Sequence, residues 1–180
     1  MIKIYNSLTN RLEEFKPIKE NELSMYVCGP TVYNYLHIGN SRPVIFFDVV
    51  SRFFKYLGYK VTYVSNFTDI DDKIIKKAKE LNVSESEVRE KFIKITYNLY
   101  HKLNCLPHDK NPKVTENMDG IIDFINKMVE LGGAYVVDHD VYFDVAKIKE
   151  YGILSGQSVE NLINGARIEP NSKKHNAIDF

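Results

Sequence analysis

The feature that most constrains the fold is a short apolar run that stops at a glycine and a proline and leads into a helical repeat. The run Met25–Cys28 is followed by Gly29 and Pro30, a pattern typical of a buried parallel strand that delivers its last residue to a loop. Apolar residues then recur at helical spacing, with Pro43 placed in a first turn and Gly58 as a stop. These residues are Val44, Phe47, Val50, Phe54 and Leu57.

A second strand and helix follow the first pair. The run Val61–Val64 leads through Ser65–Thr68 to Asp69, Asp71 and Asp72, whose charges suit the positive end of a helix dipole. Alternating strands and helices predict an α/β fold with a parallel sheet, in which ligands bind beyond the carboxyl ends of the strands. The segments Cys28–Asn40 and Asn66–Asp69 are therefore expected to face one crevice.

The remaining elements follow from local patterns. Ser84 and Glu87 have the spacing of a capping box, and apolar residues at Val88, Phe92, Ile95, Leu99 and Leu103 predict the helix behind it. Other predicted elements are a hairpin of Ile2–Tyr5 with Leu12–Phe15, a loop over Cys105–Pro112, a helix over Ile121–Leu131 closed by Gly132, and an inserted hairpin of Ala134–Val137 with Val141–Phe143. Beyond Gly165 the chain becomes polar.

Charge and cysteine content narrow the class of protein. Lys+Arg and Asp+Glu are balanced at 24 each among 180 residues, so no overall positive field indicates a nucleic-acid partner. Cys28 and Cys105 lie far apart without disulfide-framework spacing, which favours a reducing compartment. Neither a secretion signal nor a membrane-length apolar run is present. We expect a soluble, cytoplasmic protein with no membrane partner.

The loop Cys28–Asn40 has the residues that phosphate chemistry needs. A helix N-terminus offers unpaired N–H groups to an anion, and Gly39 lets a nucleotide approach the backbone. His37 and Asn40 are three residues apart and could donate hydrogen bonds to phosphate oxygens as charge shifts during a displacement. The alternative interpretation is that His37 is only a capping histidine, which is the commoner role of a lone His-x-Gly-Asn.

The run from Cys28 to Pro43 resembles the signature of cysteinyl-tRNA synthetases, class I enzymes with a His-Ile-Gly-His type motif. The fourth position is Asn40 here, which can donate a hydrogen bond but cannot carry a positive charge. The resemblance runs nearly end to end through four further blocks: Tyr63–Ile75, Asp140–Asp144, Gly152–Gln157 and Gly165–Arg167.

The resemblance implies the first half of a Rossmann-like, ATP- and cysteine-binding catalytic domain over residues 1–110. Residues 111–180 would begin a connective insertion that is incomplete in this chain. The implied function is cysteine–tRNA ligase: ATP-dependent activation of cysteine to cysteinyl-adenylate, then transfer to its tRNA. The chain is expected to be an N-terminal fragment that is inactive alone and does not hold tRNA tightly.

The family pattern also assigns roles to residues. It implies His37 and Asn40 as catalytic, ATP binding by these two with Pro30, Thr31 and Gly39, and cysteine binding by Gly29 and Thr68. ATP would be the substrate with magnesium. Cys28 would be one of four zinc ligands, the other three following later, and zinc would bind the substrate thiolate in preference to a hydroxyl. From its local sequence alone, Cys28 would be a buried structural cysteine, which is a commoner role for a cysteine than that of a ligand.

Other interpretations remain open. A stand-alone, non-catalytic paralogue could bind a nucleotide, RNA or protein, and a cysteine ligase acting on a sugar amine shares the resemblance. A small nucleotidylyltransferase ranks last, because its Gly-x-Phe-Asp-Pro opening and late phosphate loop are absent.

Cys105 and His108 have Cys-x-x-His spacing but no second pair, which predicts an ordinary loop. Tyr33 and Tyr35 are expected to be packing residues.

Overall fold

The structure is a computed structural model that describes residues 2–156 and 173–180. Two compact units can be distinguished: residues 17–118 form one, and residues 1–16 with 119–180 form the other. The predicted block Gly165–Arg167 and the position Gln157 lie outside the described residues. Within the described ranges, no helix is both long and apolar enough to cross a membrane.

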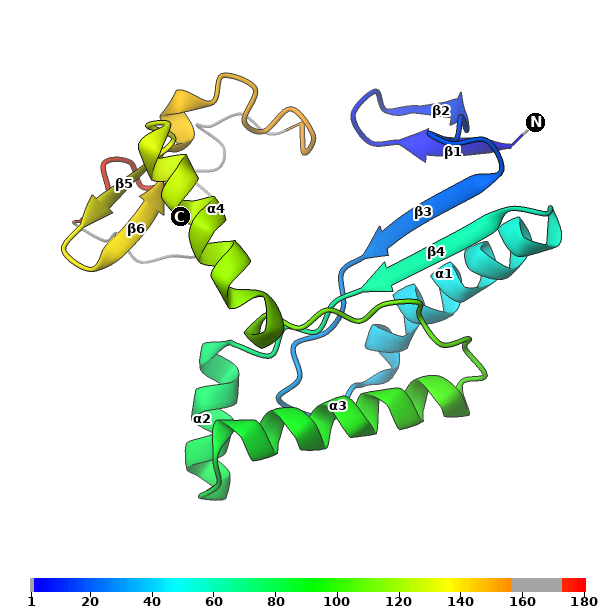
Figure 1. Cartoon of the computed structure of the whole chain (residues 1–180), viewed down its shortest axis with the longest axis horizontal. Helices are drawn as coiled ribbons and strands as arrows, with labels where there is room; N and C mark the ends of the chain where they lie inside the picture. The colour runs from blue at the N-terminus through cyan, green and yellow to red at the C-terminus, as the bar shows by residue number, and fades with distance from the viewer. Residues whose placement is uncertain (1, 157–172) are drawn as a thin grey trace. The chain divides into compact units, whose positions relative to one another are not determined.

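The unit of residues 17–118 has the predicted order of alternating strands and helices (Figure 1). Strand β3 (Glu22–Val27) pairs in parallel with β4 (Lys60–Ser65), with Glu22 opposite Lys60 and Val27 opposite Ser65. Helix α1 (Ile38–Tyr56) joins the two strands, and α2 (Asp72–Leu81) and α3 (Glu85–Lys102) follow β4. The predicted α/β class is confirmed.

The prediction that β3 is a buried strand is wrong. Its residues alternate between half-buried and exposed, and Tyr26 is 62% exposed. In β4 only every second residue, at Val61, Tyr63 and Ser65, is buried, as in a sheet packed on one face. Helix α1 contacts both strands, and burial of a parallel strand requires cover on both faces, which an apolar run alone does not guarantee.

Helix α1 begins earlier than predicted, at Ile38, so Pro43 lies inside the helix and not in its first turn. Gly58 has a φ of +87° just past the helix, which confirms the predicted stop.

One face of α1 is buried, and it includes Asp48. The Asp48 carboxylate accepts hydrogen bonds from Arg52 Nε at 2.7 Å and from Leu106 N at 2.8 Å.

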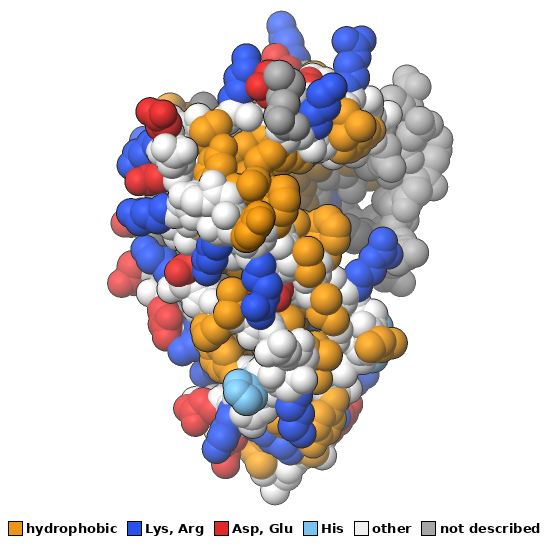
Figure 2. Space-filling view, turned by 90° about the vertical axis from the view of Figure 1, so that its right-hand side faces the viewer, with side chains coloured by type: hydrophobic (Ala, Val, Ile, Leu, Met, Phe, Trp, Pro, Cys, Tyr) orange, Lys and Arg blue, Asp and Glu red, His pale blue; other side chains and the backbone are white. Residues whose placement is uncertain are grey.

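An apolar face of α1 stays at the surface. Figure 2 shows hydrophobic side chains exposed among charged ones over the visible side of the molecule. On α1 the exposed large hydrophobic residues are Ile38, Ile45, Phe46, Val49, Phe53 and Tyr56. The helix therefore has apolar side chains on more than the face that packs on the sheet.

The hydrophobic core of this unit lies between the loop after β3, the loop after β4, and helices α2 and α3. Its buried members are Val32, Phe67, Ile74, Ala78, Val88 and Phe92. On α3 the fully buried stripe is Val88, Phe92, Thr96 and Tyr100, while the predicted Ile95 and Leu99 are half-buried. Thr96 can be buried because its hydroxyl donates to the Phe92 carbonyl at 2.8 Å.

The predicted loop over Cys105–Pro112 is confirmed, and its end runs alongside β4. Lys110 pairs with Val64 and Lys113 with Phe67, both in parallel. Ser65 N donates to the Lys110 carbonyl at 3.0 Å, and Phe67 N donates to the Pro112 carbonyl at 2.9 Å. The polar, proline-containing sequence does not look like a strand, yet such a segment is acceptable at a sheet edge.

The other unit contains both predicted hairpins. Strands β1 (Lys3–Asn6) and β2 (Arg11–Glu14) are antiparallel, as are β5 (Ala134–Val137) and β6 (Asp140–Phe143). Helix α4 (Met118–Glu130) confirms the predicted amphipathic helix, and Gly132 follows it with a φ of +72°. This unit also contains a short 3₁₀ helix at Val145–Lys147 (η2), whereas a second one at Thr115–Asn117 (η1) belongs to the unit of residues 17–118.

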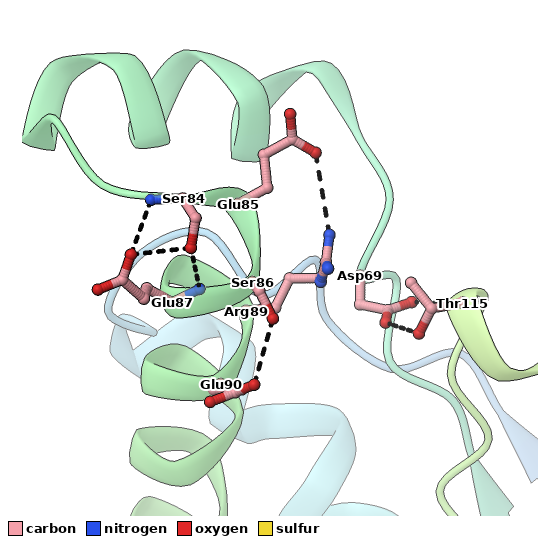
Figure 3. Close-up of polar contacts among 8 residues, drawn as sticks. All are labelled: Asp69, Ser84, Glu85, Ser86, Glu87, Arg89, Glu90 and Thr115. Carbon is pink, nitrogen blue, oxygen red and sulfur yellow. Dashed lines mark hydrogen bonds and ion pairs between the residues drawn. The ribbon is translucent and has the colours of Figure 1, made fainter.

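The start of α3 confirms the predicted capping box (Figure 3). The Ser84 hydroxyl accepts from Glu87 N at 3.2 Å, and the Glu87 carboxylate accepts from Ser84 N at 2.9 Å. Each bond satisfies a backbone donor that the helix itself leaves unpaired. The hydrogen bond from Ser84 N also lowers the pKa of the Glu87 carboxyl.

Replacing the cap should weaken the fold. We expect Ser84→Ala to reduce the free energy of unfolding by about 1 kcal/mol, because the hydroxyl that starts α3 is lost. Ser86→Ala is the matched control: Ser86 lies within the same first turn, and its hydroxyl contacts only the exposed Glu90 at 3.2 Å. Urea unfolding followed by circular dichroism measures both, and equal losses would contradict the capping argument.

Candidate functional site

The site begins where β3 and β4 end, because their parallel pairing continues into the loops. Thr68 N donates to the Pro30 carbonyl at 3.2 Å, Val32 N donates to the Thr68 carbonyl at 3.2 Å, and Thr31 pairs with Thr68 in parallel. The predicted juxtaposition of the two segments at the strand ends is confirmed for these residues. Gly29, Pro30, Thr31 and Thr68 are thus brought together.

Gly29 is required by the close approach of the two chains. Its N–H donates to Asn66 Oδ1 at 2.9 Å, and a Cβ at this position would overlap the Asn66 carbonyl oxygen. The Asn66 amide group also donates to Thr68 Oγ1 at 3.4 Å. The sequence reasoning placed the Asn66 segment at the crevice but missed its side chain, for which the only signal is a polar residue directly after a strand.

The loop from Thr31 to His37 contacts helices α2 and α3. Val32 is 1% exposed within the core, and the Tyr35 ring meets the edge of Phe92 with centroids 5.5 Å apart. Tyr33 is half-buried, with the Lys73 ammonium 5.5 Å from its ring centroid. Tyr33 therefore packs as predicted, whereas Tyr35 is 66% exposed and packs only through its contact with Phe92.

His37 and Asn40 form a reciprocal capping box at the start of α1. His37 Nδ1 accepts from Gly39 N at 3.0 Å, and Asn40 Oδ1 accepts from His37 N at 3.0 Å. Because Nδ1 is the acceptor, a neutral ring has its proton on Nε2, and the Asn40 amide nitrogen keeps its two hydrogens. Capping and donation to a ligand therefore use different atoms, so the capping interpretation of His37 does not exclude a second role.

The structure shows why residue 39 is a glycine, which the sequence did not reveal. A Cβ at this position would lie 2.7 Å from His37 Cε1 and 3.0 Å from His37 Nδ1. The glycine therefore leaves room for the imidazole to fold back over the first turn. The first turn of α1 also contains no acidic side chain, so its positive end is not neutralised from within the helix.

Of the acidic residues before α2, Asp71 and Asp72 lie at the helix start as predicted, and Asp69 does not. Asp71 caps α2 by accepting from Lys73 N at 2.9 Å, as expected of a helix start. Asp69 does not act at the helix terminus: it is 1% exposed and accepts from Thr115 N at 3.1 Å and Thr115 Oγ1 at 2.5 Å (Figure 3). Spacing along the chain could not reveal a partner 46 residues away.

Cys28 lies exposed at the end of β3, so the interpretation as a buried structural cysteine is wrong. A structural zinc ion needs four protein ligands. In the described parts of the chain, three or more His, Cys, Asp or Glu side chains never group so as to hold a metal ion. The described residues therefore do not fit a complete zinc site, and Cys28 can be no more than one of its ligands.

Cys105 and His108 line a separate cavity of about 290 Å³ with Tyr97, Tyr100 and Asn111. Burial lowers the pKa of the His108 imidazole and raises that of the Cys105 thiol. The imidazole lies against Tyr63, with ring centroids 4.2 Å apart, and its Nδ1 is 2.9 Å from Asn111 Nδ2. Both shifts favour neutral groups, which suits packing rather than metal binding or nucleophilic chemistry.

The amino-acid sequence of the chain matches a known protein family. The family described as tRNA synthetases class I (C) catalytic domain matches residues 14–180. The chain is 55% identical to a cysteine–tRNA ligase of Fusobacterium nucleatum, over all of this chain and 38% of that relative. It is 52% identical to cysteine–tRNA ligases of Listeria welshimeri and Staphylococcus haemolyticus, and covers 38% and 39% of them. The chain thus spans less than half the length of these relatives.

A solved structure shares the fold at lower sequence similarity. Methionyl-tRNA synthetase of Mycobacterium tuberculosis, in complex with methionyl-adenylate, superposes with a TM-score of 0.57 and 17% identity. The match covers 63% of this chain and 23% of the synthetase chain. The predicted Rossmann-like class I fold is therefore confirmed as a partial domain.

Substitution of Gly29 tests whether the two strand ends must touch. We expect Gly29→Ala to lower stability by at least about 2 kcal/mol, because the new methyl group meets backbone that cannot move without breaking the pairing. Gly120→Ala is the control, since a Cβ there has open space and lies in helix α4, where alanine should stabilise by up to about 1 kcal/mol. Thermal unfolding decides, and a Gly29→Ala variant as stable as the parent would contradict the close contact.

Proposed function

The chain belongs to the class I (C) tRNA synthetase catalytic-domain family, and from that premise we propose that it is the ATP- and cysteine-binding part of a cysteine–tRNA ligase. Residues 1–110 would supply the first half of the catalytic domain and residues 111–180 the start of the connective insertion. The relatives extend well beyond the matched region, and the exposed apolar face of α1 supports the interpretation of the chain as a fragment. The compartment we propose is the cytoplasm.

The observation that supports ATP binding best is the capping box of His37 and Asn40. It leaves the imidazole Nε2–H and the Asn40 amide hydrogens outside the box, at the positive end of a 19-residue helix. Phosphate oxygens are the ligands for which such a helix start is suited. Pro30 and Thr31, on the loop that Val32 anchors, and Gly39, in the first turn of α1, would form the rest of the ATP-binding surface.

In the proposed reaction, a cysteine carboxylate oxygen attacks the α-phosphorus of ATP. The bond to the bridging oxygen breaks, and pyrophosphate leaves with magnesium to yield cysteinyl-adenylate. Negative charge shifts over the phosphate oxygens during this displacement, and His37 and Asn40 would stabilise it by donating hydrogen bonds. Neither residue exchanges a proton with the substrate in this scheme, so an asparagine can serve at position 40.

Gly29 and Thr68 would border the cysteine substrate, because the paired strand ends place both residues at the edge of the sheet where the loops begin. The cysteinyl group would then pass to the terminal adenosine of the tRNA. A family zinc ion, when bound, would select the substrate thiolate, and Cys28 would contribute one thiolate ligand to it. Contacts with tRNA would involve the remaining length that the relatives possess.

Titration with ATP tests the proposed function directly. We expect millimolar affinity, about −4 kcal/mol, because the chain corresponds to only part of a complete ligase. The amide signals of Gly39 and Asn40 in NMR spectra should shift, and His37→Ala should reduce the shifts. His139→Ala is the control, since that exposed histidine lies in the turn between β5 and β6.

Two results would overturn the assignment of the ATP site. One is submicromolar affinity for ATP, which a helix start of this kind cannot supply alone. The other is a set of shifts restricted to β5 and β6, far along the chain from the capping box.

Zinc content tests the role proposed for Cys28. We expect the 180-residue chain to retain no stoichiometric zinc after dialysis against a mild chelator, because one thiolate cannot close a tetrahedral site. Elemental analysis of the parent, Cys28→Ala and Cys105→Ala measures this. One zinc per chain that is lost in Cys28→Ala would contradict the expectation, and loss in Cys105→Ala would reveal a site at the other cysteine.

A further inference from the structure

We propose that Asp69 is a positioning residue of the candidate site, which acts through Thr115 to hold both strand-end loops in place. The proposal rests on the proposed function for its link to ATP binding. Its structural part concerns only residues within the unit of residues 17–118. Asp69 is buried, its carboxylate makes two hydrogen bonds, and the backbone bonds of Ser65, Phe67 and Thr68 lie next to it in the chain.

Among the described residues, both hydrogen bonds of the Asp69 carboxylate come from Thr115. One oxygen accepts from Thr115 N at 3.1 Å and the other accepts from Thr115 Oγ1 at 2.5 Å. Only 1% of Asp69 is exposed, and a buried carboxylate is costly unless its oxygens are satisfied. Two bonds to one residue fix orientation as well as distance, so Thr115 determines where Asp69 can lie.

Asp69 and Thr115 lie at the end of three chain segments that run side by side. The segment after β4 is the middle one, with the loop after β3 on one side and the residues from Lys110 onward on the other. In the middle segment, Ser65 and Phe67 bond to the carbonyls of Lys110 and Pro112 on one side. On the other side, Asn66 bonds to Gly29, while Thr68 bonds to Pro30 and Val32. A displacement of the middle segment is therefore transmitted to the loop that carries Gly29–Thr31.

No regular element holds the middle segment in register near Asp69. Strand β4 ends at Ser65 and α2 begins at Asp72 with Asp71 as its own cap. Buried Phe67 anchors the segment on one side of Thr68, and Asp69 anchors it on the other. Loss of the Thr115 bond should therefore loosen Thr68 and its partners locally, while α2 and α3 keep their own core contacts.

Thr115 is also the first residue of η1, which leads directly into α4. Asp69 thus joins the strand-end loops to η1. This explains why a carboxylate is found here and not an apolar anchor: a buried methyl group could fill the space, but could not fix the direction of the Thr115 backbone and hydroxyl.

The test uses Thr115→Val, which removes the hydroxyl and keeps the shape, and Thr115→Ser, which restores the hydroxyl. Thr9→Val is the matched control, because Thr9 Oγ1 likewise donates to a carboxylate, that of Glu13, at 2.5 Å in the β1–β2 hairpin. Hydrogen–deuterium exchange of the Val32 and Thr68 amides should accelerate about tenfold in Thr115→Val, as expected for loss of one bond to a carboxylate. Thr115→Ser and Thr9→Val should exchange like the parent at these amides.

Three outcomes decide the structural part. Unchanged exchange at Val32 and Thr68 in Thr115→Val would overturn the proposal, and so would equal acceleration throughout α3, since that indicates general destabilisation. Asp69→Asn is the second variant: it keeps the size and loses the charge, and acceleration at the same amides would support the proposal.

The link to the ligand is measured separately. In Thr115→Val the dissociation constant for ATP should rise about tenfold and return to the parent value in Thr115→Ser. An unchanged dissociation constant despite faster exchange would overturn the positioning role in ATP binding. If the parent binds no ATP, the proposed function fails, whereas the exchange result still decides whether Asp69 positions the loops.

Discussion

Backbone pairing that continues past the ends of β3 and β4 is the constraint on which the rest of the site depends. Strand pairing satisfies peptide groups that would otherwise need water or side chains. Here it persists through Thr68 on one side and is extended by Lys110 and Pro112 on the other. The loops therefore keep the spacing of a sheet, which is too narrow at Gly29 for any side chain.

The helix start adds side-chain hydrogen-bond donors and the positive end of a helix dipole to the paired loops. An ordinary capping residue uses its only polar group to satisfy the helix. His37 caps the helix with Nδ1, which leaves Nε2 for another contact. Asn40 accepts with Oδ1, which leaves its Nδ2 hydrogens for another contact. The same two side chains can therefore stabilise α1 and contact an anion, and Gly39 provides the space in which the ring folds back.

Local sequence patterns predicted the helices and strands, but they could not predict contacts between residues that are distant in the sequence. The hairpins, the Ser84 capping box and the β-α-β-α order follow from spacing within a few residues, so the sequence was sufficient for them. The exposure of Tyr26 depends on what covers the sheet, and the path of Lys110 depends on pairing with Val64. The spacing of His37 and Asn40 suggested hydrogen bonds to phosphate, whereas their assignment as catalytic residues came from the family resemblance.

The capping box of α1 also has an evolutionary consequence. Helix starts ordinarily tolerate exchange among serine, threonine, aspartate and asparagine, because each can accept the same backbone hydrogen bond. At position 37 such an exchange would preserve α1 and yet remove the ring N–H that the proposed function requires. Under the proposed function, position 37 would not tolerate the substitutions that the fold alone permits. Variants that keep the helix but lose the histidine would retain the shape of the domain without the proposed contact to phosphate.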